Sequence, residues 1–270
     1  MGHIRQITNL LPQPLRYGLR RIVFYGRSHQ CEFCGNHIRE FRSHGSRLPV
    51  LIERNVVGGL LRENDRCPVC HGCDRTRLMK LFLERKTNVG RAPVRLLHVA
   101  PEFGLYLWLH NQSNIDYVAT DMDGSRFRHI EGMRSADITH LPFDSNDFDI
   151  IVCSHVLEHV PDDVSAFQEL FRVLRPGGVA ALLTPFALDG WGTDEEPTIN
   201  DPAEQERRFG QWDHVRIYDC EDFLKRMDHA GFETNLYDPV RDNPEDAEAL
   251  HLNPAEKLPL GFKPIKPTNT

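Results

Sequence analysis

The pattern of apolar and polar positions changes character near residue 94. From there, apolar runs of strand length alternate with amphipathic runs of helical length. The predicted strands are 94–100, 115–121, 135–138, 148–154, 178–185 and 232–237, and the predicted helices are 104–112, 162–174 and 219–230. Alternating strands and helices of these lengths predict an α/β fold with a doubly wound, mostly parallel sheet.

The stretch before residue 94 lacks this rhythm. Residues 9–27 carry apolar side chains at helical spacing with arginines between them, and Pro12 and Pro14 favour a helix that starts after them. Two interpretations of this helix stay open: a partner-binding surface, or packing on the body of the chain. Residues 31–75 are rich in Cys, Gly and Arg and predict a small metal-stapled module, followed by a helix at 78–85.

Two further stretches also lack regular periodicity. Residues 186–218 form a long polar insertion, and loops of this length are usually lids or substrate-binding elements. The tail after residue 238 holds six prolines and is predicted to extend over the surface. The predicted division is an amphipathic segment 1–30, a metal module with its connecting helix 31–90, an α/β domain 91–240 with the insertion 186–218, and a Pro-rich extension 241–270.

Charge supports a division into a basic front and an acidic body. Residues 1–95 hold 18 Lys+Arg against 7 Asp+Glu, whereas the remaining residues hold 14 against 32. The basic part suits an anionic partner such as nucleic acid, a sugar nucleotide or a membrane surface. Alternatively, it docks on the acidic body of the same chain.

Composition limits the class of protein. Apolar residues make up 40% of the chain, which is enough for a full core. The most apolar central run, 179–188, is too short to span a bilayer, and the first residues lack the apolar core of a signal peptide. We expect a soluble, cytoplasmic protein.

Four of the seven cysteines form two Cys-x-x-Cys pairs, Cys31/Cys34 and Cys67/Cys70. In a reducing compartment this pattern favours metal binding over disulfides. Two such pairs complete a closed, tetrahedral, all-sulfur zinc site, which is structural. A redox dithiol or free thiols are the alternatives, and Cys73 is interpreted as a spare thiol.

Chemistry-bearing residues follow the predicted strands. The first strand ends in His98-Val99-Ala100-Pro101-Glu102-Phe103-Gly104, where only Gly104 fits the Gly-rich turn of nucleotide-binding folds. The second ends at Asp121, whose carboxylate suits both ribose hydroxyls or, equally, a helix N-cap. Asp137 suits an adenine amino group, with Ile138 packed on the ring.

The segment 141–178, LPFDSNDFDIIVCSHVLEHVPDD…RVLRPGG, resembles the core of class I S-adenosylmethionine-dependent methyltransferases. The wider pattern CxxC…CPxC…DRxR, then LLHVAPE, HVLEHVPDD and EEPTI…FGQWDHVRIY, resembles a bacterial subfamily of zinc-ribbon methyltransferases over residues 31–238. The resemblance implies a seven-stranded Rossmann-like sheet with a methyltransferase type 11-like core and an N-terminal zinc ribbon. It implies S-adenosylmethionine as cofactor, held by Ala100, Glu102, Gly104, Asp121, Met122, Asp137, Ile138, Ser154 and His155.

Methyl transfer to a hydroxyl usually needs a base at the carboxyl edge of the sheet. His155 follows the fourth strand there, and His214 lies in the insertion, where Asp213 would orient it. His214 is either this base or a clamp that fastens the lid by hydrogen bonds. Arg216 and Trp212 are candidates for binding the substrate, because Arg216 suits a phosphate or carboxylate.

Three functions fit these features. The first is methyl transfer, O- or N-directed, to a small molecule such as a natural product, sugar or sugar nucleotide. The second is methylation of RNA or DNA, with the basic module on the phosphate backbone. The third is a scaffold without catalysis, which predicts no binding of S-adenosylmethionine.

Overall fold

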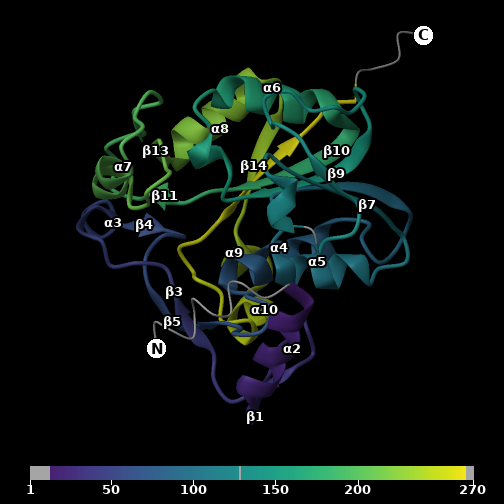
Figure 1. Ribbon diagram of the computed structural model, residues 1–270. Coiled ribbons are helices and arrows are strands. Elements are labelled where there is room, and N and C mark those ends of the chain that lie inside the picture. The colour runs from purple at the N-terminus through teal and green to yellow at the C-terminus, as the bar shows by residue number, and fades with distance from the viewer. Residues whose placement is uncertain (1–12, 128, 266–270) are drawn as a thin grey trace.

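The computed structural model describes residues 13–127 and 129–265 (Figure 1). Its centre is a sheet of seven strands in the order β14-β15-β10-β9-β6-β7-β8. The strands are β6 Val94–Val99, β7 Ile115–Asp121, β8 Met133–Ser135, β9 Phe148–Ser154, β10 Leu174–Leu183, β14 Glu233–Tyr237 and β15 Leu258–Phe262. All neighbours are parallel except β15, which runs antiparallel to both β10 and β14. The predicted Rossmann-like sheet of seven strands is therefore confirmed.

Helices cover both faces of this sheet (Figure 1). On one side lie α4 Asp74–Lys86 and α5 Phe103–His110, and on the other lie α6 Asp163–Val173 and α8 Cys220–His229. Because both faces are covered, the inner strands are apolar throughout rather than alternating, as in the buried run of β9.

The stretch predicted as an extended tail is folded, so that prediction is wrong. It contains α9 Pro239–Asp242, α10 Pro244–Ala249 and β15, which lies between β10 and β14. Pro259 sits within β15 opposite Leu236, although a proline lacks the N–H group that a strand normally donates. The prolines in this stretch obscured a strand whose leucines are buried in the core.

The insertion is also folded, against the expectation of little regular structure. It contains β11 Phe186–Ala187, β12 Asp194–Glu195, α7 Pro202–Phe209 and β13 Arg216–Asp219. These strands form a second sheet in the order β12-β13-β11-β4, where β4 is Val56–Val57. The insertion and the N-terminal module therefore share one sheet, which lies at the side of the central sheet (Figure 1).

The remaining N-terminal elements are short. They are α2 Gln13–Val23, α3 Pro49–Glu53, and two hairpins formed by β1 Tyr25–Gln30 with β2 His37–Ile38 and by β3 Arg42–His44 with β5 Arg62–Arg66. Helix α2 contacts the body through Tyr17, which meets Phe103 edge to face, and through Arg20, which bonds His71. Its leucines and Ile22 are exposed, and residues 9–12 of the predicted helix lie outside the described residues.

Two 3-10 turns, η1 Gly124–Phe127 and η2 Leu157–His159, follow strands β7 and β9. None of the helices in the described part of the chain combines the length and apolar character that a bilayer crossing needs.

Candidate active site

Strained backbone marks the carboxyl edge of the central sheet. Strands β6 and β9 end side by side, with Val99 paired to Cys153. The next residue after each strand, Ala100 and His155, has a positive φ, of 48° and 54° respectively. Such conformations cost a non-glycine residue about 1–3 kcal/mol and cluster at functional sites. Both residues are predicted cofactor contacts, and the fold brings them to the same edge.

Glu102 and Gly104 connect this edge to the N-terminal module. Arg75 of α4 donates its Nε–H to Glu102 Oε1 at 2.8 Å. A Cβ on Gly104 would lie 3.0 Å from Gly72 Cα and 3.5 Å from Cys70 Sγ. Gly104 is therefore needed where the cysteine module meets α5, and its predicted contact with the cofactor stays a prediction.

The predicted contacts for the nucleoside lie at the ends of the next strands. Asp121 Oδ1 accepts the backbone N–H of Asp123 at 2.8 Å, and Asp137 Oδ1 accepts the N–H of Thr139 at 2.9 Å. Ile138 is buried beside them, whereas Met122 is 71% exposed. Each carboxylate keeps a second oxygen outside these turns, as a nucleoside site requires.

Ser154 and His155 carry buried atoms that have no hydrogen-bond partner in the described structure. These atoms are Ser154 Oγ and His155 Nε2. An unsatisfied buried polar group costs about 1–3 kcal/mol, so such groups in a native fold call for a ligand, a water or an ion. They lie where the sequence predicts the cofactor and the acceptor to meet.

A cavity of about 270 Å³ opens beside His155. Three parts of the chain line it: the N-terminal module, the edge of the central sheet and the insertion. The lining residues are His44, Gly45, Ser46, Leu51, Val56, Gly58, Gly59, Arg75, His155, Pro185, Phe209, Gly210, Gln211, His214, Arg216 and Ile217. Both predicted catalytic histidines face one cavity although 59 positions separate them in sequence.

Burial keeps both histidines neutral. It lowers the pKa of His155 well below its usual value, and Arg75 nearby lowers that pKa further. Burial also lowers the pKa of His214, against the opposing effect of Glu158. A neutral imidazole has a free lone pair, so each ring is in the protonation state that a general base needs.

Glu158 lies behind these two rings, and sequence reasoning assigned it no role. Its side chain is buried, Oε2 accepts the hydroxyl of Thr184 at 2.8 Å, and Oε1 lies 3.4 Å from His155 Nδ1 and 4.0 Å from His214 Nε2. Glu158 follows His155 by three residues, a spacing that could have indicated their contact from the sequence. Its proximity to His214 is visible only in the fold. Asp213, expected to orient His214, instead lies 3.4 Å from His159 Nδ1 through its Oδ2.

The guanidinium of Arg216 is buried and hydrogen-bonded to other residues of the protein. It is 1% exposed, and it donates to the backbone carbonyls of Leu157, Val160 and Pro161 and to Glu195. These hydrogen bonds connect β13 to η2 and occupy the guanidinium that the sequence predicted to bind a substrate anion. Trp212, the other substrate candidate, is 61% exposed and does not line the cavity.

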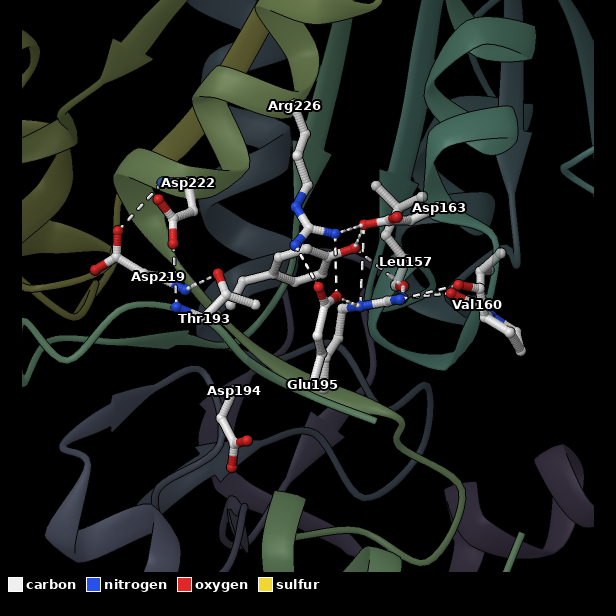
Figure 2. A network of polar contacts seen from close by, with 12 residues as sticks. Leu157, Val160, Asp163, Thr193, Asp194, Glu195, Asp219, Asp222 and Arg226 are labelled. Atoms are coloured by element: carbon white, nitrogen blue, oxygen red, sulfur yellow. Dashed lines mark hydrogen bonds and ion pairs between the residues drawn. The ribbon is translucent and has the colours of Figure 1, made fainter. Parts of the chain in front are cut away.

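Figure 2 shows the continuation of this network, in which Arg226 of α8 points at Asp163 and Glu195. Burial alone would raise the pKa of Glu195, but hydrogen bonds from Arg226 and Arg216 outweigh it and lower that pKa. Asp194 pairs instead with Arg208 of α7. Glu195 thus ties the insertion to α8, whereas Asp194 forms an ion pair within the insertion.

The four predicted metal ligands converge. The Sγ atoms of Cys31, Cys34, Cys67 and Cys70 all lie within 4.8 Å of one another. The Cys31–Cys70 and Cys34–Cys67 sulfur pairs are 3.6 Å and 3.9 Å apart. Zinc that holds four thiolates tetrahedrally at about 2.3 Å places the sulfurs about 3.8 Å apart, so the group fits this ion. Cys73 lies outside the group, with its Sγ 3.5 Å from Thr76 Oγ1 at the start of α4.

The segment of the chain that forms the middle strands of the central sheet is similar to known proteins. Residues 105–182 match the model of the methyltransferase domain family. This stretch, 78 of the 270 residues, lies within the central sheet and is similar to a methyltransferase domain.

Individual relatives resemble part of the chain. It is 47% identical over 47 residues to the demethylmenaquinone methyltransferase of Staphylococcus epidermidis, which is 17% of this chain and 20% of that protein. It is 32% identical over 117 residues to the ubiquinone/menaquinone biosynthesis C-methyltransferase UbiE of Haemophilus ducreyi, covering 38% and 44%. The chain thus spans a fifth to less than half of the length of these relatives.

Among solved structures, a putative methyltransferase of Bacillus halodurans superposes with a TM-score of 0.46 at 20% identity. The superposition covers 70% of this chain and 99% of that one.

Proposed function

We propose that the chain is an S-adenosylmethionine-dependent methyltransferase that acts on a small-molecule acceptor, such as a natural product, a sugar or a sugar nucleotide. The observation that carries this proposal is the cavity of about 270 Å³ at the carboxyl edge of the sheet. Its volume lies near the lower end of small-molecule sites, which run from about 300 to 1,000 Å³. The names of the relatives add quinone precursors to the acceptors worth testing.

The cofactor supplies a methyl group that is already activated for displacement. The chain's own residues bind and align: Asp121 suits the ribose hydroxyls and Asp137 the adenine amino group, while Ile138 packs on the ring. Buried Ser154 Oγ and His155 Nε2 have no other partner in the described structure, and His155 lines the cavity. Alignment and exclusion of water supply much of the rate enhancement in such a transfer.

The N-terminal module forms one wall of the proposed acceptor site. His44, Gly58 and Arg75 come from it, and its strand β4 pairs with β11 of the insertion. We propose that zinc, held by the four thiolates, keeps this wall in place. A closed all-sulfur site has no open position for a substrate, so its role is structural.

Methylation of RNA or DNA is the alternative, motivated by the basic charge of residues 1–95. Many of these cations are paired within the chain, for example Arg54 with Asp189, Arg75 with Glu102 and Arg85 with Asp246. Those pairs support the interpretation that the basic module docks on its own acidic body. A filter-binding assay with tRNA at low salt separates the two functions, since tight salt-dependent binding would favour the nucleic-acid acceptor.

The proposal is tested by calorimetric titration of S-adenosylhomocysteine into the zinc-loaded protein. We expect saturable binding, and we expect Asp121→Asn to weaken it because an amide cannot accept from both ribose hydroxyls. Asp123→Asn is the matched control, because this neighbour accepts only from Ser125 in the adjacent turn. A wild-type protein that binds neither S-adenosylmethionine nor its product would support the scaffold function instead.

A further inference from the structure

Three imidazoles line the acceptor cavity, those of His44, His155 and His214, and they differ in how their ring nitrogens are engaged. His44 Nε2 lies 3.1 Å from Arg75 Nη1. His155 Nε2 is buried and has no hydrogen-bond partner in the described part of the chain. His214, in contrast, places its Nε2 4.0 Å from Glu158 Oε1. Its backbone carbonyl also accepts the side-chain amide of Gln205. Of these three rings, His155 is the one with a fully buried nitrogen that has no partner among the described residues.

The other nitrogen of His155 faces Glu158. Its Nδ1 lies 3.4 Å from Glu158 Oε1, a buried oxygen that has no hydrogen-bond partner in the described structure. Contacts of this kind in a ligand-free site often shorten to a hydrogen bond only when substrate binds. Thr184 donates to Oε2 at 2.8 Å and holds the carboxylate in this orientation. The Thr184 hydroxyl occupies Oε2 as a donor, so Oε1 is the carboxyl oxygen left to accept a proton from the ring atom that faces it.

We infer that Glu158 is a positioning residue that holds His155 in the tautomer protonated at Nδ1, so that the lone pair of Nε2 is the base for a hydroxyl acceptor. This inference rests on the proposed function and narrows its acceptor to a hydroxylated small molecule. Glu158 stands to His155 as the buried carboxylate stands to the histidine of a catalytic triad. His214, the other predicted base, then serves as a second neighbour of Glu158 and as a wall of the cavity.

The proposed step balances. A lone pair of the acceptor oxygen forms the new C–O bond, while the bond between the methyl carbon and the cofactor sulfur breaks and leaves its electron pair on sulfur. The hydroxyl proton moves to His155 Nε2. The positive charge lost at sulfur appears on the imidazole, where the Glu158 carboxylate stabilises it.

The positive φ of His155 supports this role. At 54° the residue holds a conformation that a histidine rarely adopts, and the hydrogen bond from its backbone N–H to Leu183 O at 2.8 Å fixes it there. The strain directs the side chain back toward Glu158, three residues later. An ordinary continuation of β9 would send it to a face of the sheet.

Nitrogen-detected NMR of ¹⁵N-histidine-labelled, zinc-loaded protein tests the inference without an acceptor, because the shifts of the two ring nitrogens report the tautomer directly. His155→Gln assigns the signal by its loss. We expect wild-type His155 to be protonated at Nδ1 alone, and Glu158→Gln to give a mixture of tautomers because an amide can donate as well as accept. Asp213→Asn is the matched control: it removes a nearby carboxylate that faces His159, so the tautomer of His155 should stay as in the wild type.

A wild-type His155 protonated at Nε2 would overturn the inference, and this measurement needs no variant to fold. An unchanged tautomer in folded Glu158→Gln would overturn it as well, as would an equal change in Asp213→Asn. Failure of the proposed function is distinguishable, because it shows as absent binding of S-adenosylhomocysteine whatever the tautomer of His155.

Discussion

At the scale of single residues, Gly104 shows how one position serves two parts of the molecule. Its missing side chain lets the cysteine turn at Gly72 lie directly on the first turn of α5. Sequence reasoning selected Gly104 as a remnant of a nucleotide-binding motif, and the contact that requires a glycine here is with the cysteine turn at Gly72 and Cys70. The spacing of a motif can reveal that a glycine matters without revealing which neighbour it admits.

We expect Gly104→Ala to destabilise the protein by about 1–3 kcal/mol, because the new methyl group would lie 3.0 Å from Gly72 Cα and backbone must move. Chemical denaturation measures this loss, and the zinc content of the purified variant shows whether the module is displaced. Gly18→Ala in α2 is the control, since a Cβ there meets nothing within 4 Å. An equal stability for both variants would contradict the contact.

Arg216 tests whether the insertion is anchored or binds substrate. We expect Arg216→Met to lower the free energy of unfolding by about 3–5 kcal/mol, because the buried carboxylate of Asp163 and the partly exposed one of Glu195 lose a partner. Urea denaturation measures the change, and Lys225→Met, which breaks the exposed pair with Asp222, should change it little. A fully stable Arg216→Met protein would restore Arg216 as a candidate for the substrate.

The pair of His159 and Asp213 makes part of the stability depend on pH. Burial alone would lower the pKa of His159, but Asp213 and Glu158 raise it, so the stabilisation is complete below the unfolded value of about 6.5 and is lost as pH rises through the folded pKa. Burial would raise the pKa of Asp213, yet hydrogen bonds from His159 and Gln211 lower it to about 2. Its contribution is present above the unfolded pKa of about 3.9 and is lost as pH falls toward 2.

His159→Gln should therefore cost more stability at pH 5 than at pH 8. Thermal melts of variant and wild type at both values measure the difference. A cost that is the same at both pH values would mean that the imidazole is not charged in the pair.

At the scale of elements, the sequence predicted the helices and strands that have a periodic apolar pattern. It missed the short strands that form only because a distant strand pairs with them. The apolar run of β9 and the amphipathic α6 follow from periodicity alone, and their predicted bounds agree with the structure to within about one residue. Strand β4 has two residues and exists because β11 lies opposite, 130 positions later. No local pattern marks such an element, and none marks the approach of Glu158 to His214.

The cysteine cluster brings together the four residues that the sequence predicts as metal ligands, and their binding of zinc stays a prediction. We expect removal of zinc by a chelator to unfold the turns that carry the four thiolates, since metal binding and folding are coupled in such modules. Metal analysis should find one zinc per chain, lost in Cys34→Ser and kept in Cys73→Ser, because Cys73 lies outside the cluster. Zinc lost equally from both variants would contradict the assigned ligands.

At the scale of the whole molecule, the N-terminal module and the insertion meet the central sheet around one cavity. Each contributes to the wall of the same cavity, and they share a sheet through β4 and β11. Some of the basic side chains among the first 95 residues form ion pairs with acidic side chains of the rest of the chain. The amino-acid composition showed that the first 95 residues are basic and the rest acidic. It could not show what the basic residues pair with, because ion pairs within the chain and binding of an anionic partner both need the same excess of arginine and lysine.

The position of β15 has a consequence for the order in which the protein is made. Six strands of the central sheet are synthesised before it, yet β15 enters between two of them, β10 and β14. Until residues 258–262 have left the ribosome, both neighbours expose unpaired edges, and such edges invite pairing with other chains. The nascent chain is therefore prone to aggregate until β15 emerges and pairs with both neighbours. Protection by chaperones should matter most in that interval.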